Sequence, residues 1–478
     1  MDKVEDERLS GRPAGPQGGS VDKMEQLSAR AKRLLGLDRA GPLRSNLRRL
    51  KGKYRVAMAR LRRRRTKATV IGITGSSAKT TTAELLAHIL EGSGSVHKLT
   101  VSNTFNRLIE KLWRLPRNSA YAVMELGVMA KGDMARMASV LKPDIAIMTL
   151  IADEHHSAFG GRAAVAAEKQ ALVESLAPDG LAILNVDDDL IAAMALNTVA
   201  PSVTFGRSER ARYRACDIHA AYPQRLSMTI HWPGGALALR TRLIAEHFWL
   251  AVAAAAAAAL ELGVDARIIA ERVSTFEPMP TRCGVWQVRG GPTFFVDTAK
   301  TPFHSLGLAF DMLGRADAGY KRVVLGQIAD YAGKPAKAYG SAYRGARAVC
   351  DQIVFVGEHA HRSGAAQEDR DSGRFLEMRS VRQVAEHVRA TQRPDEVILV
   401  KGSRNLHLER IALAADHDVR CWEPVCGYPR SCLECGKYLI PFEQHREIRA
   451  AEKDELRAVR KRASLWRRFT PFPRRPST

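Results

Sequence analysis

Residues 70–90 read VIGITGSSAKTTTAELLAHIL, and this stretch decides the fold. An apolar run rich in isoleucine is followed by a turn of glycine and serine. A lysine and three threonines then open a segment rich in alanine and leucine. This succession predicts a buried strand, a tight loop and a helix. Because such a loop points backbone N–H groups at one spot before a helix N-terminus, it is suited to bind phosphate.

The loop supplies the candidate nucleotide ligands Gly75, Ser76, Ser77, Ala78, Lys79, Thr80 and Thr81. Lys79 would contact the β- and γ-phosphates of ATP, and the Thr80 hydroxyl would bind Mg²⁺. Ala78 stands where such loops usually have glycine. Its Cβ costs little at a negative φ, but about 1 kcal/mol or more at a positive φ. The alternative is an ordinary serine-rich turn between a strand and a helix.

Strands and helices alternate along most of the 478 residues. Apolar runs predict strands at 68–74, 120–126, 143–151 and 180–186, a β-rich stretch at 202–242 and an alanine-rich helix from Leu250. Further strands are predicted at 293–298, 322–328, 352–357 and 396–402. The rhythm predicts an α/β protein, with a central, mostly parallel sheet of the P-loop type and a second, Rossmann-like α/β unit. The expected divisions are 1–66, 67–279, 280–420 and 421–478.

Positive charge is concentrated at the two ends of the chain. The net charge is +23, of which residues 1–67 carry +13 and residues 440–478 carry +6. Residues 43–65 show helical spacing of apolar residues between arginines, which predicts a basic amphipathic arm. This arm could lie on an anionic membrane or pack on the core. We expect no specific nucleic-acid partner, since no recognised motif accompanies the arginines. Without a secretory signal or a spanning apolar run, we expect a cytoplasmic protein, with peripheral contact at the inner membrane face left open.

Several motifs resemble those of the Mur ligase family in order and spacing. They are TGSSAKTTT from Thr74, VMELGVMAKGDM from Val123, the long segment from Lys142 to Val173, and VILVKGSRNLHLERI from Val397. The resemblance extends over roughly residues 68–418. It is strongest to the branch of the family that adds D-alanyl-D-alanine.

The resemblance implies an ATP-dependent ligase that joins an acid to an amine through an acyl phosphate. Glu125 would bind a first Mg²⁺ with Thr80, and His155 would bind a second. Lys169 would be carbamylated and would act as an anionic ligand. Three alternatives stay open: a strand-end capping carboxylate at Glu125, His156 in place of His155, and an exposed helical lysine at Lys169.

The resemblance also assigns residues farther along the chain. His247, Arg282 and Asp297 would lie on the nucleotide side of the cleft. Lys401 would face the incoming amine or a phosphate, and Arg404 could pair with a carboxylate. The chain departs from the family pattern at four further positions: Phe248, Ala251, Thr298 and Lys300.

The substrates implied are a small-molecule, peptide or lipid-linked acid and an amine. Only the basic arm precedes the loop, where peptidoglycan ligases place a domain that binds a UDP-sugar. We therefore expect either a ligase of the cell-wall type or one acting on another acid, with a membrane-associated acid among the choices. A non-catalytic Mur-like protein that binds a partner is the alternative from another class.

Four cysteines cluster near the C-terminus: Cys421, Cys426, Cys432 and Cys435. Grouped thiols in a reducing compartment more often bind a metal than pair as disulfides. Structural Zn²⁺ is the first expectation, and an iron–sulfur cluster is the second. Reduced thiols in a loop, or a disulfide formed on oxidation, are the alternatives without a metal.

Overall fold

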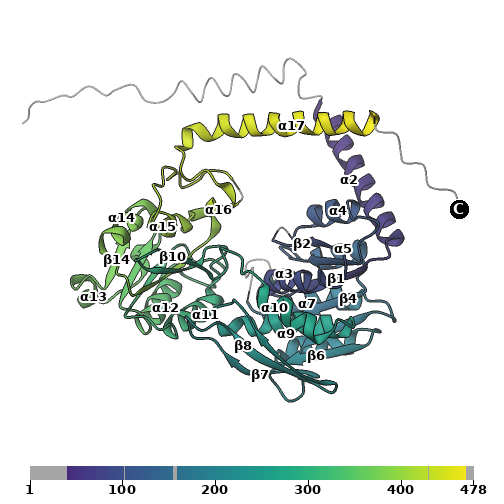
Figure 1. Ribbon diagram of the computed structural model, residues 1–478, viewed down its shortest axis with the longest axis horizontal. Helices are drawn as coiled ribbons and strands as arrows, with labels where there is room; N and C mark the ends of the chain where they lie inside the picture. Colours follow the sequence, from purple (N-terminus) through teal and green to yellow (C-terminus); the bar gives the residue numbers. More distant parts are fainter. Residues whose placement is uncertain (1–39, 102, 154–158, 429, 470–478) are drawn as a thin grey trace, which may run out of the picture.

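The computed structural model describes residues 40–101, 103–153, 159–428 and 430–469. Two sheets flanked by helices lie next to each other (Figure 1). The first has the strand order β2-β3-β1-β4-β5-β6-β7-β8-β9, and the second has the order β10-β11-β15-β12-β13-β14. Pairing is antiparallel only between β7, β8 and β9 and between β10 and β11. The predicted fold class, two mainly parallel α/β sheets, is confirmed.

The strands of the first sheet are β1 (Thr69–Thr74), β2 (Val96–Leu99), β3 (Tyr121–Glu125), β4 (Ile145–Met148), β5 (Leu181–Asn185), β6 (Ser202–Gly206), β7 (Tyr213–His219), β8 (Ser227–Trp232) and β9 (Gly235–Arg240). Those of the second are β10 (Gly284–Gln287), β11 (Thr293–Asp297), β12 (Tyr320–Leu325), β13 (Gln352–Val356), β14 (Phe375–Met378) and β15 (Glu396–Lys401).

The helices of the first unit are α2 (Ala40–Arg65), α3 (Lys79–Leu90), α4 (Phe105–Trp113), α5 (Asp133–Leu141), α7 (Arg162–Glu174), α8 (Asp189–Ala192), α9 (Trp249–Glu261) and α10 (Ala266–Thr275). Those that follow are α11 (Leu306–Gly314), α12 (Pro335–Arg347), α13 (Gln367–Asp371), α14 (Val381–Thr391), α15 (Glu409–Leu413), α16 (Cys432–Cys435) and α17 (His445–Phe469). Short 3₁₀ turns are η2 (Ala193–Asn197), η3 (Glu246–Phe248), η4 (Phe303–Ser305), η5 (Ala360–Arg362), η6 (Arg404–Leu406) and η7 (Phe442–Gln444).

Strands β1, β3, β4 and β5 of the first sheet are buried on both faces, because successive side chains point to opposite sides and helices cover both. Ile71 and Ile73 of β1 belong to the core beneath α3, α9 and α10. Val70 belongs to the core on the other face, beneath α4, α5 and α7. This two-sided burial explains why the strands read as continuous apolar runs.

Helix α2 is the predicted basic arm, and its last turns pack on the first sheet's helices (Figure 1). Ala59 is buried in the core, while Tyr54 stays exposed. The Arg62 guanidinium donates to the backbone oxygen of Leu115 at 2.6 Å, and that of Arg63 donates to Leu141 at 2.9 Å. Of the two placements predicted for the arm, packing on the core therefore holds for its C-terminal part.

The parallel strands bring chemical groups to one edge of each sheet. In the first sheet, Ile73 of β1 pairs with Glu125 of β3, so the loop after β1 begins beside this carboxylate. In the second sheet, Asp297 at the end of β11 pairs with Lys401 at the end of β15. Ligands of open parallel sheets bind at such carboxyl ends. Within the described ranges no helix is long and apolar enough to span a bilayer.

Candidate functional site

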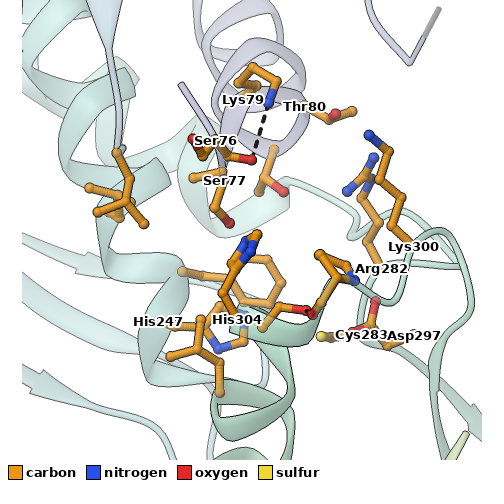
Figure 2. Close-up of a pocket in the computed structure, with 18 of the residues that line it drawn as sticks. Ser76, Ser77, Lys79, Thr80, His247, Arg282, Cys283, Asp297, Lys300 and His304 are labelled. Carbon is orange, nitrogen blue, oxygen red and sulfur yellow. Dashed lines mark hydrogen bonds between the residues drawn. The ribbon is translucent and has the colours of Figure 1, made fainter. Parts of the chain in front are cut away.

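A cavity of about 450 Å³ lies where the strand ends of the two sheets meet (Figure 2). One wall comes from the loop after β1 and from β3, and the facing wall comes from residues around β11 and β15. Of the residues predicted from the sequence, it is lined by Ser76, Ser77, Ala78, Lys79, Thr80, Thr81, Glu125, His247, Arg282, Asp297 and Lys401. Residues more than 300 positions apart thus share one site.

Gly75 starts the loop with a backbone that only glycine can supply. Its φ is +147°, and a Cβ placed there would lie 2.0 Å from the Thr149 hydroxyl oxygen. That hydroxyl donates to the Ser77 carbonyl at 2.6 Å, and so fixes the loop to the end of β4. Glycine is therefore required by both conformation and space.

Ala78 has a positive φ of 64°, in the left-handed region. It is the residue before α3, and its carbonyl accepts the Thr82 N–H at 2.9 Å in the first helical turn. The higher cost expected for alanine at a positive φ therefore applies, because a Cβ in the left-handed region strains the backbone. The chain keeps the loop conformation although it lacks the residue that suits it best.

Lys79 is the first residue of α3, and its side chain is buried beneath the loop (Figure 2). The ammonium group donates to the carbonyl oxygens of Gly75 and, at 3.2 Å, Ser76. The backbone N–H groups at the start of a helix favour an anion in the same place. The loop therefore offers both a cation and helix donors to a phosphate.

Glu125 closes β3 with its carboxylate 2% exposed. It accepts hydrogen bonds from the Thr80 hydroxyl at 3.0 Å, the Val101 N–H at 2.8 Å and the Asn103 amide at 2.9 Å. A hydroxyl and a carboxylate at the phosphate end of the loop are the oxygen donors that Mg²⁺ prefers. These residues fit the ion that the sequence predicts.

Lys169 lies on α7 with only 1% of its surface exposed, so the alternative of an exposed helical lysine is wrong. It lines a second cavity of about 400 Å³, together with Lys79 and Lys300. The second metal ligand, His155, and its alternative, His156, lie outside the described residues.

The far end of the main cavity is more apolar. Phe248, Trp249 and Leu250 line it, and the Arg207 guanidinium lies 5.6 Å from the centre of the Trp249 ring. Burial lowers the pKa of His247 to about 4, so this imidazole is neutral at pH 7. Aromatic and aliphatic walls with a neutral imidazole suit a nucleobase. Ala251, in contrast, is buried inside α9 and does not line the cavity.

Arg282 and Asp297 reach the cavity from the second unit (Figure 2). The buried Nε of Arg282 has no hydrogen-bond partner among the described residues, which leaves an N–H for a ligand. The Asp297 carboxylate accepts a hydrogen bond from the Lys401 ammonium at 2.6 Å. The same ammonium also donates to the backbone carbonyl oxygen of Lys300 at 3.0 Å. Lys401 thus lines the cavity with its charge paired with Asp297, and its predicted role toward the amine or a phosphate stays a prediction. Arg404 lies on η6 and is not among the residues lining the cavity.

Sequence reasoning missed several lining residues. His304 of η4 lines the main cavity, and its Nδ1 lies 3.1 Å from the Asp153 carbonyl oxygen. Arg136 of α5 lines the second cavity, with its guanidinium 3.7 Å from the centre of the Phe105 ring. The histidine four residues after Lys300 was an available signal, whereas nothing near Arg136 in the sequence pointed to a site.

The four C-terminal cysteines come together around a separate, small cavity. None of them is in a disulfide. Burial raises the pKa of Cys432 to about 12 and also raises that of Cys421. The convergence agrees with the predicted cluster, and a metal there stays a prediction.

Comparisons with known proteins agree with this geometry. Residues 73–259 match the Mur ligase middle domain. The UDP-N-acetylmuramoyl-tripeptide–D-alanyl-D-alanine ligase of Mycobacterium tuberculosis (strain CDC 1551 / Oshkosh) is 27% identical over 378 residues, which cover 74% of each chain. The ligase of the same name from Escherichia coli (strain K12) is 26% identical over 374 residues, covering 75% of this chain and 79% of its own.

A solved structure extends the likeness to three dimensions. MurF from Acinetobacter baumannii superposes with a TM-score of 0.68 at 25% identity, and the match covers 76% of this chain and 79% of that one. The matched domain, the relatives along most of the chain and the common fold agree: residues 73–259 are a Mur ligase middle domain, and about three quarters of the chain resembles ligases of the Mur family.

Proposed function

We propose that this protein is an ATP-dependent ligase that joins a carboxylate to an amine through an acyl phosphate. We take as its specific reaction the one named for its relatives, which is the joining of a UDP-N-acetylmuramoyl-tripeptide to D-alanyl-D-alanine. It would then serve peptidoglycan synthesis for the cell wall. The main support is the single cavity that joins the phosphate loop to Arg282, Asp297 and Lys401.

The reaction has two steps with balanced bonds. A carboxylate oxygen attacks the γ-phosphorus of ATP, and ADP leaves. The amine nitrogen then attacks the acyl carbon, and phosphate leaves with the former carboxylate oxygen while the nitrogen loses a proton to solvent. Because several anions meet in one place, fixed cations must stabilise the developing charge. Lys79 would turn from the loop carbonyls to the β- and γ-phosphates, and Arg282 would donate its unpartnered N–H to the nucleotide.

The nucleotide would lie across the cavity with its base at the apolar end, near His247 and Trp249. Its phosphates would lie over the loop from Ser76 to Thr81, and Thr80 and Glu125 would hold Mg²⁺. When bound, Mg²⁺ neutralises phosphate charge and polarises the phosphoryl oxygens.

Asp297 would keep Lys401 oriented at the edge of the site. The role of Arg404 at the substrate remains part of the proposal, although this residue does not line the cavity.

Lys169 would carry a carbamate formed from carbon dioxide, and His155 would be the second histidine ligand implied by the family. Carbamylation reverses the charge of a side chain that shares its cavity with Lys79 and Lys300. Three ammonium groups around one cavity repel each other, whereas a carbamate among them attracts both the lysines and a metal ion. This physical balance supports the modification.

The acid substrate would approach through the second cavity. This cavity shares Lys79 with the nucleotide site. It also shares Phe105, Asn106 and Arg136 with a groove of about 1050 Å³ between α2, α4 and α5. Three neighbouring cavities, each sharing lining residues with the next, thus lie between the phosphate loop and the basic helix.

The groove is strongly cationic. It is lined by Arg49, Lys53, Arg55 and Arg60 from α2 and by Arg136 from α5, and none of the described residues that line it is acidic. Such a surface attracts a ligand that carries further negative charge beyond the reacting carboxylate. We infer that the acid has a phosphorylated or polycarboxylate tail that lies along α2.

Steady-state kinetics with acids that differ only in tail charge test this inference. Lys53→Glu should raise the KM of the anionic acid roughly tenfold with little change in kcat, because it places like charge in the groove. Lys51→Glu makes the same charge change on α2 but does not line the groove, so it is the matched control. Equal effects of the two variants would contradict a specific subsite.

The ligase activity itself is tested by phosphate release from Mg-ATP in the presence of acid and amine panels. We expect release that requires both an acid and an amine. Lys79→Ala should lower the rate by at least about 100-fold, in line with the loss of a charged group that stabilises a transition state. If the intact chain binds ATP but releases no phosphate with any acid and amine, the non-catalytic alternative would replace this proposal.

A further inference from the structure

The cysteine-rich segment that follows the second sheet folds back onto α15. Cys421 and Cys432 are buried, and Cys426 and Cys435 are partly buried. With His407 and Arg410 they line one cavity of about 10 Å³, far smaller than the nucleotide site. A space of that size is suited to a single ion rather than to an organic ligand.

Basic groups contact all four sulfurs. Arg410 donates from Nε to Cys432 Sγ at 3.1 Å and from Nη2 to Cys421 Sγ at 3.6 Å. Cys426 Sγ lies 3.2 Å from His407 Nε2, and Arg449 Nη2 lies 3.9 Å from Cys435 Sγ. Such donors suit sulfurs that carry negative charge.

Arg410 gives the strongest argument. Its side chain is 2% exposed, and its remaining hydrogen bond goes to the Glu423 carbonyl oxygen at 2.8 Å. In the part of the chain that the structure describes, it forms no ion pair with a carboxylate. A buried guanidinium needs a compensating anion. If the sulfurs are thiolates, they are that anion, and a divalent metal is what allows several thiolates to lie together.

Among the residues that the structure describes, two more buried atoms at this place have no hydrogen-bond partner, although the His407 ring and the Glu409 carboxylate lie 3.6 Å apart. These atoms are His407 Nδ1 and Glu409 Oε2. Ligand atoms of His407, Glu409 and Cys432 all lie within 4.8 Å of one another, and among the described residues no other group of three such atoms is as close, so the other three sulfurs would have to move inward around an ion. The other carboxylate oxygen, Glu409 Oε1, accepts the backbone N–H of Cys432 at 2.8 Å. Polar groups of this kind orient metal ligands from behind.

We propose that Cys421, Cys426, Cys432 and Cys435 bind one Zn²⁺ ion as thiolates, with Arg410 donating hydrogen bonds to two of the sulfurs. Four thiolates and Zn²⁺ carry a net charge of −2, which the surrounding Arg410, Arg430 and Arg449 offset. The tetrathiolate set is typical of structural zinc. The small cavity favours a single ion over an iron–sulfur cluster.

The ion would fix a segment that has little regular structure. Between Val419 and α17, the longest helix is the four-residue α16. Cys432 joins the core formed with Leu408 and Ile411, so the site connects the segment to the second sheet's helices. Metal binding can hold such a segment where a small apolar core does not. This role is independent of the proposed ligase activity.

Elemental analysis of the full-length chain, purified without a metal-affinity tag and dialysed, is the test. We expect one zinc per chain, and Co²⁺ substitution should give a sulfur-to-metal charge-transfer band. Cys432→Ala and Cys426→Ser should each lose the zinc and the band. Cys350→Ala is the matched control, because Cys350 is buried but does not line the cavity. It should keep both signals.

Circular dichroism and binding of Mg-ATP report whether the variants still fold. The site is supported if a cysteine variant loses its zinc but keeps the circular dichroism spectrum and the Mg-ATP binding of the parent chain. Four thiols that react freely in a folded chain without zinc would overturn it. Stoichiometric iron with sulfide, or a disulfide between two of these cysteines, would overturn it equally.

Discussion

Two residues of the phosphate loop have positive φ angles, and one of them is not a glycine. The loop therefore keeps its conformation although the backbone preference of alanine opposes it. Gly75 is fixed by both its φ and the nearby Thr149 hydroxyl. Ala78 adopts a left-handed φ without the glycine that would make it easy. The bonds around it, such as that from the Thr82 N–H, hold the loop in place. Strain of this kind is typical of binding sites.

Ala78→Gly should make the protein more stable. Removing the Cβ relieves the left-handed backbone, and we expect the free energy of unfolding to rise by about 1 kcal/mol. The shift of the denaturation midpoint measures it. Ala83→Gly, inside α3, is the control and should lower stability instead, because glycine weakens a helix interior. A loss of stability in Ala78→Gly as large as in the control would contradict the strain.

His247 should make stability depend on pH. Its pKa in the folded chain is lowered from 6.5 to about 4, chiefly by burial. The folded state therefore binds fewer protons than the unfolded state between these values. Its contribution to stability is complete above pH 6.5 and is lost as the pH falls toward 4. We expect the Tm to fall less between pH 7 and pH 5 in His247→Gln than in the parent chain. An equal fall would assign the dependence to other groups.

Elements position these residues, and α2 is the one whose placement the sequence left open. Its last turns are held by the buried Ala59 and by guanidinium bonds from Arg62 and Arg63 to loop carbonyls. Its middle turns form a wall of the cationic groove. Packing of the last turns therefore sets the position of the proposed substrate subsite.

Ala59→Asp should detach α2. The change buries a carboxylate in the core, where an unpaired charge is costly. Trypsin should then cleave at the arginines of α2 at least several-fold faster. Ala57→Asp carries the same change at an exposed position of α2 and should leave the cleavage rate unchanged. Equal cleavage of the two variants would show that α2 does not depend on this contact.

The sequence was most informative where local chemistry is repetitive. The strand of Val70, the phosphate loop and the alanine-rich helix were all predicted, because buried parallel strands are continuous apolar runs and glycine loops are distinctive. Strand β2 (VHKL) was missed because it is short and partly polar. The Asp297–Lys401 pair was missed because the register of two strands 104 positions apart decides it. Arg136 enters its cavity only through the packing of α5.

At the scale of the whole molecule, the two sheets contribute to one site. The first supplies the loop, Thr80 and Glu125, and the second supplies Arg282 and the Asp297–Lys401 pair. Neither set alone surrounds a nucleotide. The cavity between the sheets is therefore completed by both, and in the proposed reaction its charges would shield the triphosphate beside the acid.

Isothermal titration calorimetry of the full chain with Mg-ATP tests this central claim most directly. We predict saturable binding of one nucleotide, weakened at least about tenfold by Lys79→Ala on the first wall and by Arg282→Ala on the second, since each removes a charged partner of the phosphates. No binding by the parent chain, or unchanged affinity in both variants, would contradict a nucleotide site built between the two sheets.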